Sequence, residues 1–121
     1  MKSLLIIAHG SRRQASNDEV RQLSEKIAAQ NAEFDLVECA FLELADPSIP
    51  QGLEHCIERG AREVVVMPYF LAAGRHVAED IPQEVAPIQQ KYPEVTITVT
   101  PHLGASAYMP NAILKLAVAD A

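Results

Sequence analysis

Short aliphatic runs alternate with helical patterns along this chain, and that alternation limits the fold more than any other feature. Apolar runs typical of buried strands occupy residues 2–8, 36–42, 62–70 and 95–99. The segments between them are too long for hairpins, so the strands are expected to run parallel, with helices crossing over between them. The third run is nearly all β-branched at its centre, which favours a central strand covered on both faces. The predicted fold is an α/β three-layer sandwich around a four-stranded parallel sheet.

The helical segments show apolar side chains at a spacing near 3.6 residues, and their ends carry boundary signals. Ser16 or Asn17 could cap the first helix, and Asp46 followed by Pro47 is a good start for the second. The other expected boundaries are Gly60 after the second helix, Asp80 before Pro82 at the start of the third, Pro87 as its end or kink, and a last helix from Met109 to about Val118.

Length and composition describe an ordinary globular chain. Its 121 residues are expected to form one domain, 1–121, which is large enough to bury a core. A net charge of −6 argues against nonspecific nucleic-acid binding, which requires a basic surface. No apolar run reaches the roughly 18 residues of a membrane span, and the first residues lack a signal-peptide pattern. Cys39 and Cys56 lie in apolar settings and are expected to be reduced, so a cytoplasmic location is predicted.

Three of the strand-like runs are followed by a side chain that can bind a metal ion. His9 follows the first run, Glu43 the second, and His76 comes shortly after the third. Because ligands of parallel α/β sheets bind beyond the carboxyl ends of the strands, these three side chains are expected to converge. Two imidazoles and a carboxylate suit a divalent first-row metal ion.

Each of these residues also has a simpler interpretation. The segment from His9 to Arg13 could be only a turn between strand and helix, and Glu43 could be a solvated strand end. A similar His-Gly string opens the histidine phosphatases, but Ala8 stands where those enzymes carry a phosphate-binding arginine. His102, after the fourth run, could be a further ligand or line a pocket, and His55 is expected to be a surface residue of the second helix.

Three segments, in order and in register, resemble the small CbiX-type sirohydrochlorin chelatases. They run from Ala8 to Arg12, from Phe41 to Ile49, and from Pro68 to Pro82, and the resemblance extends to about Gly104. Members of that family insert a divalent metal ion into a cyclic tetrapyrrole without ATP. The short members are half the size of the two-domain chelatases and work as symmetric homodimers. The resemblance therefore implies a chelatase-like half that pairs with a second copy.

The same resemblance implies roles for individual residues. His9 and His76 would be the catalytic, metal-handling histidines, and Glu43 their acidic partner. Cobalt is the favoured metal substrate, with iron or nickel as alternatives, and no organic cofactor is expected. The macrocycle is a polycarboxylate, which an acidic chain should repel, so a basic rim is expected at the mouth of the site. The residues expected to bind this substrate are Ser11, Arg12, Arg13, Arg75 and His102.

Two other functions remain open. A metal-delivery or tetrapyrrole-binding protein would hold the metal ion or the macrocycle and insert nothing. A hydrolase or phosphate-binding domain could use His9 as nucleophile or base, although the chain lacks a glycine-rich phosphate loop. A neutral imidazole can both bind a cation and accept a proton, which fits metal insertion well. The sequence therefore favours the chelatase.

Overall fold

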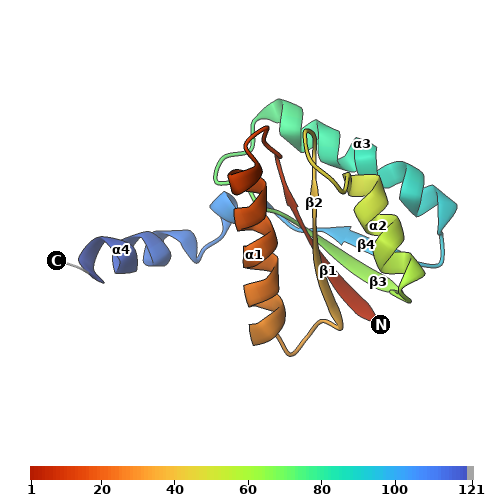
Figure 1. Ribbon diagram of the computed structural model, residues 1–121, viewed down its shortest axis with the longest axis horizontal. Coiled ribbons are helices and arrows are strands. Elements are labelled where there is room, and N and C mark those ends of the chain that lie inside the picture. The colour runs from red at the N-terminus through yellow and green to blue at the C-terminus, as the bar shows by residue number, and fades with distance from the viewer. Residues whose placement is uncertain (120–121) are drawn as a thin grey trace.

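The computed structural model describes residues 1–119, without the side chain of His76, as a four-stranded parallel sheet flanked by helices (Figure 1). The strand order is β2-β1-β3-β4, so β1 and β3 are the inner strands. The predicted α/β sandwich is confirmed. The elements are β1 (Lys2–Ala8), α1 (Gln14–Gln30), β2 (Leu36–Phe41), α2 (Ile49–Glu58), β3 (Glu63–Pro68), α3 (Arg75–Lys91), β4 (Thr96–Val99), the 3-10 turn η1 (Leu103–Ala105) and α4 (Met109–Ala119).

The main hydrophobic core lies between the sheet and the pair α2 and α3. Alternate residues of each strand point into it, as the pleat of a strand requires. Leu5 and Val66, for example, are fully buried and stand opposite each other in the register of β1 and β3. The helices contribute the apolar faces expected from their spacing, and the buried members are Ile49, Leu53, Cys56, Ile81, Val85 and Ile88.

The starts of the first two helices differ from the predictions. In α1 the N-cap position belongs to Arg13, so neither Ser16 nor Asn17 caps the helix. In α2 the cap is Ser48 rather than Asp46, because Ser48 and Gln51 form a reciprocal capping box. The end of α2 is as expected, since Gly60 follows the helix with a φ of 111° that favours glycine.

The third helix is longer than predicted at its start. It begins at Arg75 rather than near Asp80, and both Pro82 and Pro87 lie inside it. The prediction that the helix could end at Pro87 is wrong, because the helix continues to Lys91. Both prolines are exposed, so the carbonyl groups that lose an intrahelical partner are on the side of the helix open to water.

The opposite face of the sheet is only partly covered. Helix α1 packs there against β2 and buries Ile6 and Phe41, and the Arg21 guanidinium lies 5.1 Å from the centre of the Phe41 ring. On the same face of β3, Val65 and Met67 remain half-exposed. The prediction that the third strand is covered on both faces is therefore wrong. Among the helices described, none is both long and apolar enough to cross a membrane.

Candidate metal-handling site at the strand ends

The hydrogen bonding between β1 and β2 continues past the ends of the two strands into the loops that follow them. The amide of Leu42 donates to the Ala8 carbonyl, and the amide of Glu43 donates to the His9 carbonyl. Gly10 follows with a φ of 94°, and a Cβ there would overlap the carbonyl oxygen of Glu43. This close approach brings the two loops together, and only glycine permits it.

His9 and Glu43 are in direct contact at this edge. Nε2 of His9 lies 2.9 Å from Oε1 of Glu43, and just over half of each side chain is exposed. The ring of Phe70, from the loop after β3, stands edge-on to the imidazole with the ring centres 6.5 Å apart. The predicted convergence of His9 and Glu43 is thus present, and Phe70 is a neighbour that the sequence reasoning missed.

The loop after β1 is held by a buried side chain. Asn17, which is 4% exposed, accepts a hydrogen bond from the Ser11 amide and donates one to the Ser11 carbonyl. The Ser11 hydroxyl accepts from the Arg13 amide at 3.0 Å. Asn17 therefore holds the loop that carries His9, a role signalled in the sequence only by an amide side chain early in a helix.

The third predicted ligand comes from the first turn of α3. The side chain of His76 lies outside the described part of the structure, so only its place in that turn, after β3, is known. The preceding residue, Arg75, is exposed and pairs with Glu79, Nε to Oε1 at 3.2 Å. The turn follows β3 in a parallel sheet, so its backbone begins at the edge where β1 ends, and the convergence of the His76 side chain with His9 stays a prediction.

The remaining residues predicted to bind substrate surround this edge. Arg12 and Arg13 are exposed in the loop after β1, and neither forms an ion pair within the described residues. His102 follows β4 and is half-buried. It lines two hollows, of about 170 and 470 Å³, and both also contain Thr100. The roles of these residues stay predictions.

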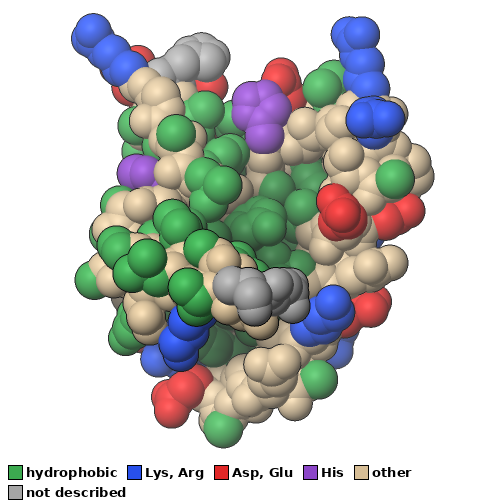
Figure 2. All heavy atoms as spheres, turned by 90° about the vertical axis from the view of Figure 1, so that its left-hand side faces the viewer, with side chains coloured by type: hydrophobic (Ala, Val, Ile, Leu, Met, Phe, Trp, Pro, Cys, Tyr) green, Lys and Arg blue, Asp and Glu red, His purple; other side chains and the backbone are tan. Residues whose placement is uncertain are grey.

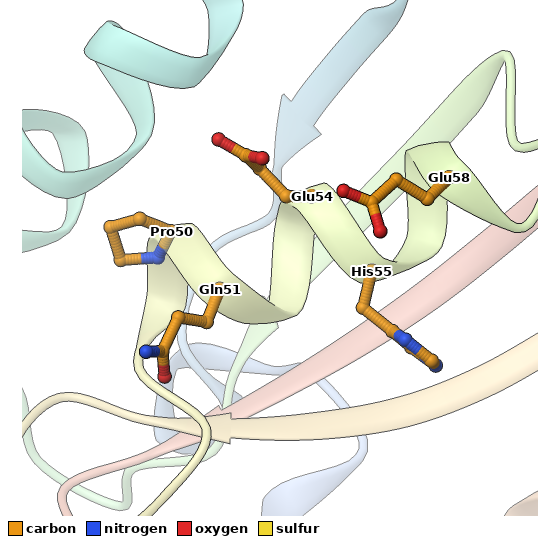
Figure 3. Close-up of a pocket in the computed structure, with 5 residues that line it drawn as sticks. All are labelled: Pro50, Gln51, Glu54, His55 and Glu58. Atoms are coloured by element: carbon orange, nitrogen blue, oxygen red, sulfur yellow. The ribbon is translucent and has the colours of Figure 1, made fainter.

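His55 lies elsewhere, as expected for a surface histidine. It is exposed on α2, in the wall of a shallow hollow of about 340 Å³ that Figure 3 shows, and its Nε2 lies 3.5 Å from Oε1 of Glu38. Within the described residues, no group of three or more histidines, cysteines or acids could hold a metal ion. A site with three ligands therefore depends on a side chain beyond His9 and Glu43.

The chain is similar to known proteins in sequence and in fold. The model of the CbiX family matches residues 3–119. The chain belongs to the CbiX family. A crystal structure of a cobalamin biosynthesis CbiX protein from Marinobacter aquaeolei is similar with a TM-score of 0.84 and 25% identity, covering 99% of this chain and 97% of that one.

Two relatives carry names that state an activity. A sirohydrochlorin cobaltochelatase of Methanococcus maripaludis is 42% identical over 83 residues, which are 69% of this chain and 57% of that protein. A sirohydrochlorin ferrochelatase of Priestia megaterium is 36% identical over 97 residues, 80% of this chain and 36% of that protein. The chain thus spans between about a third and somewhat more than half the length of these two relatives.

Proposed function

We propose that this chain inserts a divalent metal ion into sirohydrochlorin without ATP, with cobalt as the favoured metal substrate and iron or nickel as alternatives. The observation that supports this most directly is the contact between His9 and Glu43 at the strand ends of a CbiX-family chain. The two relatives carry the names of a cobaltochelatase and a ferrochelatase for the same macrocycle. Imidazole and carboxylate ligands bind both metals, so the ligand types alone do not select one.

Glu43 can prepare His9 for metal binding. An ionised carboxylate only accepts hydrogen bonds, so a neutral His9 facing it across the 2.9 Å contact keeps its proton on Nε2, and this N–H donates a hydrogen bond to Oε1 of Glu43. The lone pair of the imidazole is then on Nδ1. That nitrogen can bind a cation, and the carboxylate on the far side of the ring fixes the orientation of the imidazole.

Insertion exchanges two pyrrole protons for one divalent cation, so the site must both hold the cation and accept protons. His9 and His76 are proposed to hold the cation while it loses water, and Glu43 is proposed to accept protons. The His9 and Glu43 side chains are 53% and 56% exposed, which lets a large flat macrocycle approach them.

The proposal includes the surroundings of the site. Arg12, Arg13 and Arg75, with Ser11 and His102, are proposed to bind the carboxylates of the macrocycle, because guanidinium groups pair with carboxylates in a bidentate way. The chain is proposed to act as a cytoplasmic homodimer. Both cysteines are free thiols, in keeping with a reducing compartment.

The test is the visible absorption of sirohydrochlorin mixed with cobalt and catalytic amounts of protein. Wild type is compared with His9→Ala, His76→Ala and Glu43→Gln, and the assay is repeated with iron and nickel. His55→Ala is the matched control, because it removes an exposed, carboxylate-paired histidine away from the strand ends. We expect a wild-type rate above the spontaneous rate, lost in both site histidine variants and kept in the control.

Other results would redirect the assignment. Tight binding of the macrocycle with no acceleration for any of the three metals would favour a carrier that inserts nothing. Acceleration that survives both His9→Ala and His76→Ala would leave the family assignment intact and show that the proposed residues are wrong.

A further inference from the structure

The backbone of Ser11 takes both of its hydrogen-bond partners from one buried side chain of α1. Ser11 lies beyond the end of β1, where the backbone leaves the strand ladder and needs other partners. Asn17 accepts the Ser11 amide on Oδ1 at 3.0 Å and donates from Nδ2 to the Ser11 carbonyl at 2.8 Å. The Asn17 side chain is shielded from water, so breaking this pair would leave buried polar groups unpaired. The loop that carries His9 is thus tied to α1.

Arg21, one helical turn after Asn17, ties the loop after β2 to the same helix. Its Nη2 donates to the Asp46 carbonyl at 3.0 Å, and Glu43 lies three residues before that carbonyl. The guanidinium is itself oriented by Asp18, whose Oδ1 accepts from Nη1 at 2.9 Å. Residues i and i+4 share one face of a helix, so both loops are attached to the same side of α1. Figure 1 shows α1 beginning at the end of the sheet where β1 and β2 finish.

The backbones of these two loops decide where the His9 and Glu43 side chains point. Just over half of each side chain is exposed, so packing alone does not fix either of them. Figure 2 likewise shows histidine side chains standing at the surface of the molecule. The loops touch each other where the Glu43 amide donates to the His9 carbonyl at 3.0 Å. Because a misplacement of about 1 Å can cost about 100-fold in rate, an attachment of both loops to one rigid helix has functional value.

We infer that Asn17 and Arg21 are positioning residues for the metal-handling site, and that α1 sets the separation of His9 and Glu43 by holding their two loops at a fixed spacing. The inference rests on the proposed roles of His9 and Glu43 in handling the cation. Asn17 acts through the loop, since its amide oxygen and nitrogen are already bonded to Ser11. Arg21 also acts through its loop, because a guanidinium has no acceptor that could bind a cation.

Calorimetric titration with cobalt alone tests the functional part of the inference. Asn17→Leu keeps the size of the side chain and removes both hydrogen bonds, and Arg21→Met keeps an aliphatic stem and removes the guanidinium. Each should weaken cobalt binding about tenfold or more, as is typical when a residue that orients a metal ligand is lost. Ser24→Ala is the matched control, because Ser24 is a buried polar residue of the same helix whose hydroxyl donates to the Val20 carbonyl. The control should bind cobalt like wild type.

The pattern of these affinities separates positioning from other effects. Removing the positive charge of Arg21 should by itself strengthen cation binding, so weaker binding in Arg21→Met cannot come from the charge. Urea unfolding gives the folded fraction of each variant, and lower stability alone does not change the affinity of that fraction. Because both residues hold one spacing, the loss in the double variant should fall short of the product of the two single losses. Losses that multiply, or unchanged affinity in both variants, would overturn the inference.

Amide hydrogen exchange followed by NMR tests the geometry without metal or macrocycle. The Ser11 amide is bonded to Asn17 and the Glu43 amide to the His9 carbonyl, so both should exchange slowly in the wild type. In Asn17→Leu both should exchange about fivefold faster or more, whereas Ser24→Ala should leave the Glu43 amide unchanged. Faster exchange at Ser11 alone would show that the clamp is local, and the inference would be wrong.

Two further arrangements keep this test decisive. If Asn17→Leu does not fold, Asn17→Asp takes its place, because it keeps the acceptor for the Ser11 amide and loses the donor to the Ser11 carbonyl. A wild type that binds no cobalt would count against the proposed function, and the exchange of the Glu43 amide would then decide the inference on its own.

Discussion

Replacing Gly10 with alanine tests how tightly the loops after β1 and β2 are joined. The new Cβ would lie 2.9 Å from the Glu43 carbonyl carbon and overlap its oxygen, at a φ of 94°. The left-handed backbone costs a residue with a Cβ about 1–2 kcal/mol, and forced overpacking costs about 1–3 kcal/mol. The smaller conformational freedom of the unfolded alanine chain offsets about 0.4–1 kcal/mol. The free energy of unfolding should therefore fall by about 1–4.5 kcal/mol.

Urea unfolding followed by far-ultraviolet circular dichroism measures this loss. Gly74→Ala is the matched control, because Gly74 lies beside the same site with a φ of −68°, and a Cβ added there would meet no atom within 4 Å. At that position alanine is a poorer N-cap than glycine, which lowers stability, but it also restricts the unfolded chain, which raises stability. The free energy of unfolding is therefore expected to change by no more than about 0.5 kcal/mol.

The Gly10 variant should remain folded at 25 °C, since domains are typically stable by about 5–15 kcal/mol. Its loops must separate, so the contact between His9 and Glu43 should be lost as well, and cobalt binding measured by calorimetry should weaken. The reasoning would be refuted if the Gly10 variant were as stable as wild type, or if the Gly74 variant lost as much stability as the Gly10 variant. Either result would show that the close approach of the two loops does not require glycine at position 10.

Two further predictions concern capping and thiols. Ser48→Ala removes the acceptor of the Gln51 amide in α2 and should lower the free energy of unfolding by about 1 kcal/mol in the same urea assay. As a control, Gln51→Glu keeps the side-chain oxygen that accepts from the Ser48 amide, and it should lower that free energy by less than half as much. Burial raises the pKa of Cys39 and Cys56, so above about pH 8.5 the unfolded chain binds fewer protons there and stability falls as pH rises. The double variant Cys39→Ser with Cys56→Ala should show a flatter decline between about pH 8 and 10, and an unchanged slope would contradict this.

The sequence was most informative where a rule of sheet geometry applied. Parallel strands end at the same edge, so placing His9 and Glu43 each after a strand was enough to predict that they converge, and the structure adds their direct contact. The need for glycine at position 10 could not be predicted in the same way. It depends on how closely the loop after β2 approaches, which is a property of the assembled sheet.

Helix starts and strand coverage were less predictable. Asp46 and Ser48 are both good capping residues, and only the spacing of Ser48 to Gln51 separates them. Pro82 resembles a first-turn proline, yet packing of the buried face holds the helix together on both sides of it. The apolar run around Val65 indicates burial on both faces, but the described chain supplies no second layer over it.

The central position of β1 has a consequence for synthesis of the chain. This strand is made first, but one of its two neighbours, β3, ends about 60 residues later. At roughly 5–20 residues per second, the aliphatic side of β1 waits about 3–12 s on the ribosome before that neighbour can pair with it. During this interval Leu5 and Ile7 have only β2 and the helices already made to shield them. Chaperone dependence of the nascent chain should therefore be greatest before β3 emerges.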